Sequence, residues 1–131
     1  MSSENNRITI SEIDNLYHLF CTRVRLNPNK VAYLYCEGES PERKSLTWSE
    51  MANHVGLWQA ALKSENLNPG ERVAIMVNNC PQWVMFEQAA IGLGLVVVPM
   101  YTNDRAENVA YMIDDAQIKL LFIETNEQWQ E

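Results

Sequence analysis

Apolar residues in this chain fall into runs that suit helices and runs that suit strands. Over residues 12–25 they recur at intervals of three and four, which is typical of a helix, and Ser11 is its predicted N-cap. Residues 31–36 (VAYLYC) are rich in aromatic and β-branched side chains and predict a strand. The polar stretch 37–45 predicts a loop, after which strand pairing briefly resumes at 46–47.

A second helix is predicted to begin at Thr47, because Thr47-Trp48-Ser49-Glu50 has the form of a capping box. Beyond this helix, Leu67-Asn68-Pro69-Gly70 is a turn, with proline presetting one dihedral angle and glycine free to take positive φ. Residues 73–77 are continuously apolar, as expected of a strand covered on both faces.

The third helix is predicted to begin at Asn78 or Asn79, with Pro81 in its first turn. Its apolar residues leave it little polar surface, so we expect it to be buried between the sheet and other parts of the fold. Gly92 and Gly94 end it.

Two further elements complete the pattern. Residues 95–98 predict a buried strand that Pro99 ends, and residues 119–123 predict another. Between them, Asn103 or Asp104 caps a helix that runs to Asp114 or Asp115.

The order from Thr47 onward is helix, strand, helix, strand, helix, strand. Such alternation with apolar strands predicts an α/β fold, a parallel sheet flanked by helices and joined by right-handed crossovers. We expect one α/β unit over residues 1–131, with residues 1–10 disordered.

Composition narrows the possible functions. The net charge is −7, and residues 102–131 hold two basic and seven acidic residues, which argues against nucleic acid as a partner. The sequence has 47% hydrophobic and 21% charged residues, which is typical of a globular protein. It shows no apolar run long enough to span a membrane and no signal peptide, so we expect a cytoplasmic protein. We interpret the acidic end as a solvated helix face rather than a partner site.

Residue types that could carry chemistry are scattered. Cys21, Cys36 and Cys80 show no paired spacing, and with only two histidines, far apart, no metal-binding pattern appears. Cys80 lies beside a predicted helix start that could lower a thiol pKa, although a structural thiol is the favoured interpretation. His18 and His54 have no nucleophile near them in sequence, so packing or surface roles are favoured over general base catalysis.

Several other motifs have structural explanations. Gly92-Leu93-Gly94 follows a helix and precedes a strand, the reverse of a dinucleotide-binding loop, and so predicts a helix C-cap. Asp114 and Asp115 are adjacent and point about 100° apart on a helix, so they do not converge on one ligand. Trp48, Trp58 and Trp83 could stack on a base, but they occur at core spacing. The predicted strand ends carry Asn78, Pro99 and Glu124, a weak match to a phosphoacceptor site.

Residues 46–104 resemble the N-terminal part of the adenylate-forming (AMP-binding) superfamily, which includes acyl-CoA synthetases. The resemblance rests on L-T-W-S-E-M at 46–51, N-P-G-E-R-V-A-I at 68–75, N-C-P-Q-W at 79–83 and A-A-I-G-L-G-L-V-V-V-P at 89–99. The continuation into M-Y-T-N-D is most similar to bacterial long-chain fatty acid–CoA ligases.

The resemblance implies an enzyme that activates a fatty acid with ATP and Mg²⁺ and transfers it to coenzyme A. The family's phosphate-binding loop ending in Pro-Lys-Gly, its Thr-Glu, its ribose-binding Asp and its lid Lys have no counterpart in residues 1–131. We therefore predict no catalytic, cofactor-binding or metal-binding residue here, and expect an inactive N-terminal fragment of the large domain. The alternative is a stand-alone α/β interaction module, and a homodimer is plausible in either case.

Overall fold

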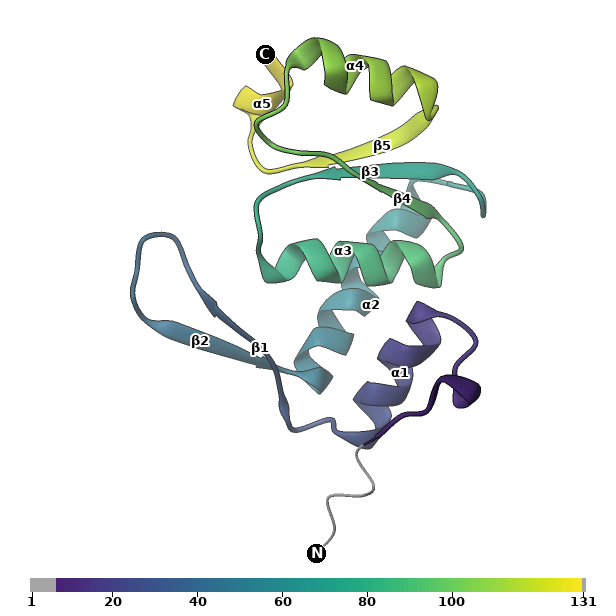
Figure 1. Cartoon of the computed structure of the whole chain (residues 1–131), viewed down its shortest axis with the longest axis vertical. Helices are drawn as coiled ribbons and strands as arrows, with labels where there is room; N and C mark the ends of the chain where they lie inside the picture. The colour runs from purple at the N-terminus through teal and green to yellow at the C-terminus, as the bar shows by residue number, and fades with distance from the viewer. Residues whose placement is uncertain (1–6, 131) are drawn as a thin grey trace, which may run out of the picture.

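The computed structural model describes residues 7–130, and the predicted disorder of residues 1–10 lies partly outside that range. A short 3₁₀ helix, η2 (Ile10–Glu12), precedes an α/β body (Figure 1). Its elements in chain order are α1 (Leu16–Leu26), β1 (Val31–Cys36), β2 (Arg43–Thr47), α2 (Trp48–Ser64), β3 (Arg72–Met76), α3 (Pro81–Gly92), β4 (Val96–Pro99), α4 (Ala106–Asp115), β5 (Ile118–Ile123) and α5 (Asn126–Gln130).

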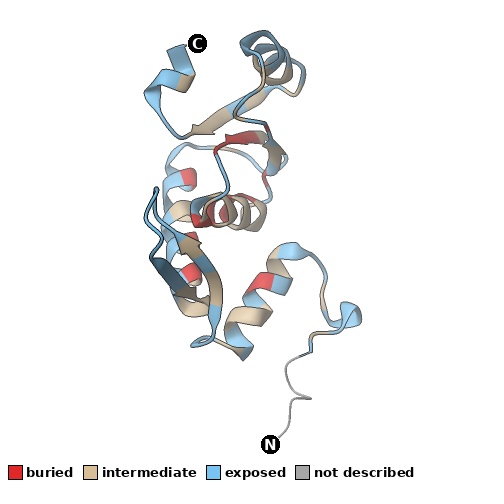
Figure 2. Cartoon of the chain, turned by 60° about the vertical axis from the view of Figure 1, so that its left-hand side comes forward, coloured by how far each residue is buried: buried red, intermediate tan, exposed pale blue. Residues whose placement is uncertain are grey.

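The predicted parallel sheet is confirmed. Its strand order is β4-β3-β5, so β3, which is apolar after Arg72, lies in the middle and pairs in parallel with both neighbours. β1 and β2 form a separate antiparallel hairpin, which projects from the body and is largely exposed (Figures 1 and 2).

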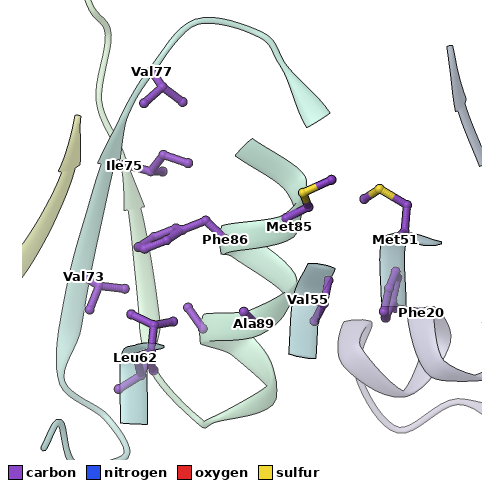
Figure 3. Close-up of a cluster of buried hydrophobic side chains, with 12 residues drawn as sticks. Phe20, Met51, Val55, Leu62, Val73, Ile75, Val77, Met85, Phe86 and Ala89 are labelled. Atoms are coloured by element: carbon purple, nitrogen blue, oxygen red, sulfur yellow. The ribbon is translucent and has the colours of Figure 1, made fainter. Parts of the chain in front are cut away.

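The middle strand separates two apolar layers, because successive side chains of a strand point to opposite faces. Val73, Ile75 and Val77 face α3, where Phe86 and Ala89 are fully buried (Figure 3). Ala74 and Met76 belong to the second layer, against which α4 packs. Helix α3 thus lies between the sheet and helices α1 and α2, as predicted (Figure 1).

Three short motifs form as their sequences predict. The Thr47 hydroxyl accepts a hydrogen bond from the Glu50 amide at 3.2 Å, and the Glu50 carboxylate accepts one from the Thr47 amide at 2.7 Å, which completes the capping box of α2. Pro69-Gly70 forms a turn with φ of +86° at Gly70. Gly94, with φ of +75°, ends α3 in a Schellman motif, in which the Gly94 and Leu95 amides donate to the carbonyls of Ile91 and Ala90.

The first helix begins later than predicted. Its N-cap is Asn15, not Ser11, because the chain is extended at Ile13 and the Asn15 side chain accepts a hydrogen bond from the His18 amide at 2.8 Å. The Glu12 carboxylate is already bonded to Thr9, so the predicted first turn of α1 belongs to η2.

The predicted N-caps of α3 and α4 were also wrong by one or two residues. Helix α3 begins directly at Pro81, whose fixed φ suits the first helical position, so Cys80 rather than Asn78 or Asn79 is the N-cap. Helix α4 has Arg105 at its N-cap instead of Asn103 or Asp104. The predicted loop 37–45 ends at residue 42, because β2 extends back to Arg43 and pairs with β1.

Candidate functional site

The carboxyl edge of the parallel sheet brings together polar side chains from all three strand ends. Asn78 follows β3, Thr102 follows β4 and Glu124 follows β5. The Asn78 amide donates a hydrogen bond to the Glu124 carboxylate at 2.8 Å, and its carbonyl oxygen accepts one from the Thr102 hydroxyl at 3.2 Å. Asn78 therefore joins the ends of the two edge strands across the middle strand.

This edge is also a topological switch point. From β3 the chain passes through α3 to β4 on one side of β3, and from β4 it passes through α4, on the opposite face of the sheet, to β5 on the other side, so the strand order reverses between β3 and β5 (Figure 1). In open α/β sheets ligands bind where neighbouring strands send their connections to opposite faces, outside the carboxyl ends of the strands. The Asn78–Glu124 hydrogen bond spans the ends of β3 and β5.

A groove of about 900 Å³ adjoins the switch point, between α4 and α5 on the outer layer of the sheet. Its floor includes Met76 and Leu121, and Thr102 lies at the end nearest the polar network. Tyr111 and Trp129 line it but are 68% and 71% exposed, so the groove is open to solvent.

The groove is acidic. Among its lining residues that the structure describes, four are carboxylates and none is a lysine or arginine. These carboxylates are Asp104, Glu107, Asp114 and Asp115. Hydrogen bonds from the Asn108 side chain and the Arg105 amide, each 2.8 Å long, lower the pKa of Asp104.

The two histidines lie in helices α1 and α2, and neither takes part in the hydrogen bonds that join the strand ends. His18 lies in the first turn of α1, where its Nδ1 accepts a hydrogen bond from the Asp14 amide at 3.3 Å. His54 is an exposed residue of α2. Over residues 7–130, no group of three or more His, Cys, Asp or Glu side chains could hold a metal ion.

All three cysteines are free, and two of them share a hollow. Cys36 at the end of β1 and Cys80 before α3 both line a space of about 360 Å³ between the hairpin and α3. Tyr33 lines the same space, and burial, followed by the nearby charge of Glu87, raises the pKa of its hydroxyl. Burial likewise raises the pKa of Glu87.

Other side chains pack closely against both Gly92 and Gly94. A Cβ atom at Gly92 would lie 2.4 Å from Gln59 Nε2, and one at Gly94 would lie 3.3 Å from Pro69 Cβ. These glycines sit at the C-terminal end of α3, so they offer no amides to a phosphate as a helix N-terminus would. The motif does not fit a nucleotide phosphate.

Trp48, Trp58 and Trp83 pack into the body as their spacing predicts. The Trp48 ring contacts Phe20 with centroids 6.1 Å apart, and the Trp58 ring lies 4.8 Å from that of Phe122. Trp83 packs against the same cluster. Their stacking surfaces are therefore used inside the protein.

Sequence reasoning found Asn78 and Glu124 but missed Thr102. The signal that identifies Thr102 is the pairing register, since Arg72 of β3 pairs with Val96 of β4 and the two strands end at neighbouring positions. Gln128 of α5 was also missed, and its side-chain oxygen accepts a hydrogen bond from the Glu124 amide at 2.8 Å.

Comparison with known proteins identifies relatives of nearly the whole chain. The AMP-binding enzyme family matches residues 20–131. The long-chain-fatty-acid–CoA ligase FadD15 of Mycobacterium bovis is 29% identical over 119 residues, which are 90% of this chain and 19% of that protein. Acetyl-coenzyme A synthetase of a Marinomonas species is 30% identical over 112 residues, 84% of this chain and 17% of that protein. The chain thus spans less than a fifth of the length of these relatives.

Solved structures share the fold. The crystal structure of VinN superimposes with a TM-score of 0.80 at 23% identity, over 88% of this chain and 28% of that one. The N-terminal subdomain of Klebsiella oxytoca NpsA gives 0.73 at 22% identity, over 83% of this chain and 27% of that one. Among residues 7–130, no helix has the length and apolar character needed to cross a bilayer.

Proposed function

Because the chain belongs to the family of AMP-binding enzymes, we propose that it is the N-terminal part of the large domain of an ATP-dependent acyl-CoA ligase that acts on a long-chain fatty acid. The observation that carries this proposal is the alignment of 90% of the chain with 19% of a long-chain ligase. The continuation of residues 89–99 into M-Y-T-N-D supports the long-chain assignment.

In this proposal the described residues act as a scaffold. The fully buried side chains of β3 and α3 hold the parallel sheet against α2, and Asn78 ties the strand ends together at the edge where ligands bind in such folds. ATP, Mg²⁺ and coenzyme A would be held by residues beyond the described part, since neither the glycine motif nor any carboxylate cluster of residues 7–130 fits them. We propose that the chain alone is inactive.

The alternative of a stand-alone interaction module is not favoured by the comparisons, which identify ligases and synthetases. A cytoplasmic location and a homodimer stay predictions. Sedimentation velocity at several concentrations tests for the dimer. If the chain dimerises, its sedimentation coefficient should rise with concentration.

The test of the ligase proposal begins with the coding sequence after codon 131. We expect a Ser/Thr/Gly-rich segment ending in Pro-Lys-Gly, and the protein encoded by the extended frame should form acyl-CoA from a sixteen-carbon fatty acid, ATP and coenzyme A. Acetate, assayed in parallel, serves as the matched substrate, because one relative is an acetyl-coenzyme A synthetase. Activity on acetate alone would contradict the long-chain assignment. A stop codon with no such segment downstream would contradict the ligase proposal itself.

A further inference from the structure

The two outer strands of the parallel sheet differ in how well their free edges are protected. β4 has four residues and ends at Pro99. The Val96 and Met100 amides each donate to a carbonyl oxygen of residues 71–75 at 2.9 Å, so they point toward the middle strand. Because successive peptide groups of a strand point to opposite sides, Val97 and Pro99 face outward, and proline has no amide to offer. The free edge of β4 is therefore a poor template for another strand.

The free edge of β5 lacks this protection. The strand has six residues, Ile118–Ile123, with no proline and a single charged residue, Lys119. Its one irregularity in register lies at its start, and residues 120–123 then pair in unbroken register with residues 73–76 of β3. Every residue of this run that points away from β3 offers both an amide and a carbonyl to a neighbouring strand. Proteins cover a long, regular and apolar edge of this kind, because it otherwise pairs with other chains.

The side chains of β5 are those of an inner strand, because helices cover apolar residues on both of its faces. On the face that α3 covers, the Phe122 ring centroid lies 4.8 Å from that of Trp58 and 5.2 Å from that of Phe86. On the face that α4 covers, Leu121 packs in the same layer as Met76 and the apolar side chains of α4. Apolar residues on both faces are typical of a strand inside a parallel sheet. None of the six residues of β5 is fully buried, however, whereas four of the five residues of β3 are.

The positions of the helices indicate toward which side of the sheet the chain continues. A crossover through α3 takes the chain from β3 to β4, and a crossover through α4, on the opposite face, takes it back past β3 to β5. Crossovers between parallel strands are right-handed, so a helix on the α4 face always moves the chain in the direction from β4 to β5. Gln128 and Trp129 of α5 line a groove together with residues of α4, so α5 lies on the α4 face (Figure 1). A crossover that begins with α5 therefore leads past β5, away from β3.

We propose that a further strand of the same polypeptide pairs in parallel with the free edge of β5, so that the sheet continues beyond β5 and not beyond β4. This inference rests on the proposed function, in which the polypeptide extends beyond residue 131. The chain covers only 27% of the solved NpsA N-terminal subdomain, which leaves ample sequence for such a strand in a protein of this fold. Because parallel strands end at the same edge of a sheet, the residues after the new strand would lie beside Glu124 and its hydrogen bond to Asn78.

Hydrogen exchange, followed by mass spectrometry that resolves single amides, tests the proposal on the 131-residue chain and on the protein of the extended reading frame. In an outer strand every second amide has no strand partner and exchanges fast, whereas in an inner strand all amides are bonded. In the chain alone, both β4 and β5 should contain fast amides. In the longer protein the fast amides of β5 should slow by about tenfold or more, while the outward amide of Val97 should stay fast. β4 is thus the matched control within the same molecule.

Three results would overturn the inference. One is a longer protein that forms acyl-CoA while β5 keeps its fast amides, which would leave the ligase proposal standing. Another is slowing at Val97 without slowing in β5, because the new strand would then lie beside β4. The third is loss of the fast amides of β5 in the chain alone as its concentration rises, because the occupant would then be a second copy of the chain. Slowed amides in β5 of a longer protein that forms no acyl-CoA would support the new strand and contradict only the ligase proposal.

Discussion

Replacing Gly92 by alanine should destabilise the protein, although the same change usually stabilises a helix. Gly92 is the last residue of α3, where α3 meets α1 and α2. An added Cβ would lie 2.4 Å from Gln59 Nε2 and 2.7 Å from Tyr17 Cε2, closer than such atoms approach in proteins. The Gln59 amide cannot simply move away, because it donates to the Tyr17 hydroxyl at 3.2 Å and to the Ala89 carbonyl at 3.4 Å.

Opposing free-energy terms decide the sign. Alanine is favoured over glycine in a helix interior by about 1 kcal/mol, and less at a helix end. Overpacking costs about 1–3 kcal/mol, and loss of the Gln59–Tyr17 hydrogen bond costs about 1 kcal/mol more. We therefore expect Gly92→Ala to lower the free energy of unfolding by about 1–3 kcal/mol.

Urea denaturation followed by circular dichroism measures this change, with Gly56→Ala as the matched control. Gly56 lies inside α2, and an added Cβ there meets nothing within 4 Å, so alanine should raise the free energy of unfolding by roughly 0.5–1 kcal/mol. In a Gln59→Ala background, Gly92→Ala should cost less, because the closest contact has been removed. If Gly92→Ala stabilises the protein as much as Gly56→Ala does, the packing argument is refuted.

Three further predictions concern stability. Thr47→Ala removes the N-cap of α2 and should lower the free energy of unfolding by about 1 kcal/mol in urea denaturation, and an unchanged midpoint would contradict the cap's role. Gly94→Ala puts a residue with a Cβ at a backbone φ of +75° and places that Cβ 3.3 Å from Pro69. It should therefore cost about 1 kcal/mol of stability and lower the Tm by several degrees. An equal or higher Tm would contradict this strain. Burial raises the pKa of Glu87 in the folded state above its value in the unfolded state, so the folded protein loses stability as the pH rises between these two values. Glu87→Gln should therefore be more stable than the wild type at pH 7, and the difference should shrink below pH 4. A difference in stability that does not change with pH would count against this argument.

The sequence predicted those parts of the fold whose signals are local. The continuously apolar residues of β3, the capping box at Thr47 and the Pro69-Gly70 turn each specify their own conformation, and the alternation of elements specified the parallel sheet. Strand β2 was only partly predicted, because Arg43, Lys44 and Ser45 are exposed in the hairpin and carry no apolar signal.

Features that depend on tertiary geometry could not be predicted. Thr102 and Asn78 are 24 positions apart, and only the register of β3 against β4 brings them together. The start of α1 was predicted at Ser11 from its residue type, but the bonds of Glu12 to Thr9 place Ser11 in η2, and Asn15 is the N-cap. The acidic groove required α4 and α5 to be placed over the same face of the sheet.

The central claim is that residues 1–131 form the scaffold of an acyl-CoA ligase and do not perform its chemistry. Carboxylate-dependent exchange of pyrophosphate into ATP, measured with the purified 131-residue chain beside the protein of the extended reading frame, tests it most directly. The account predicts exchange by the longer protein with a long-chain fatty acid, and none above background by the chain alone. Exchange by the chain alone would contradict it.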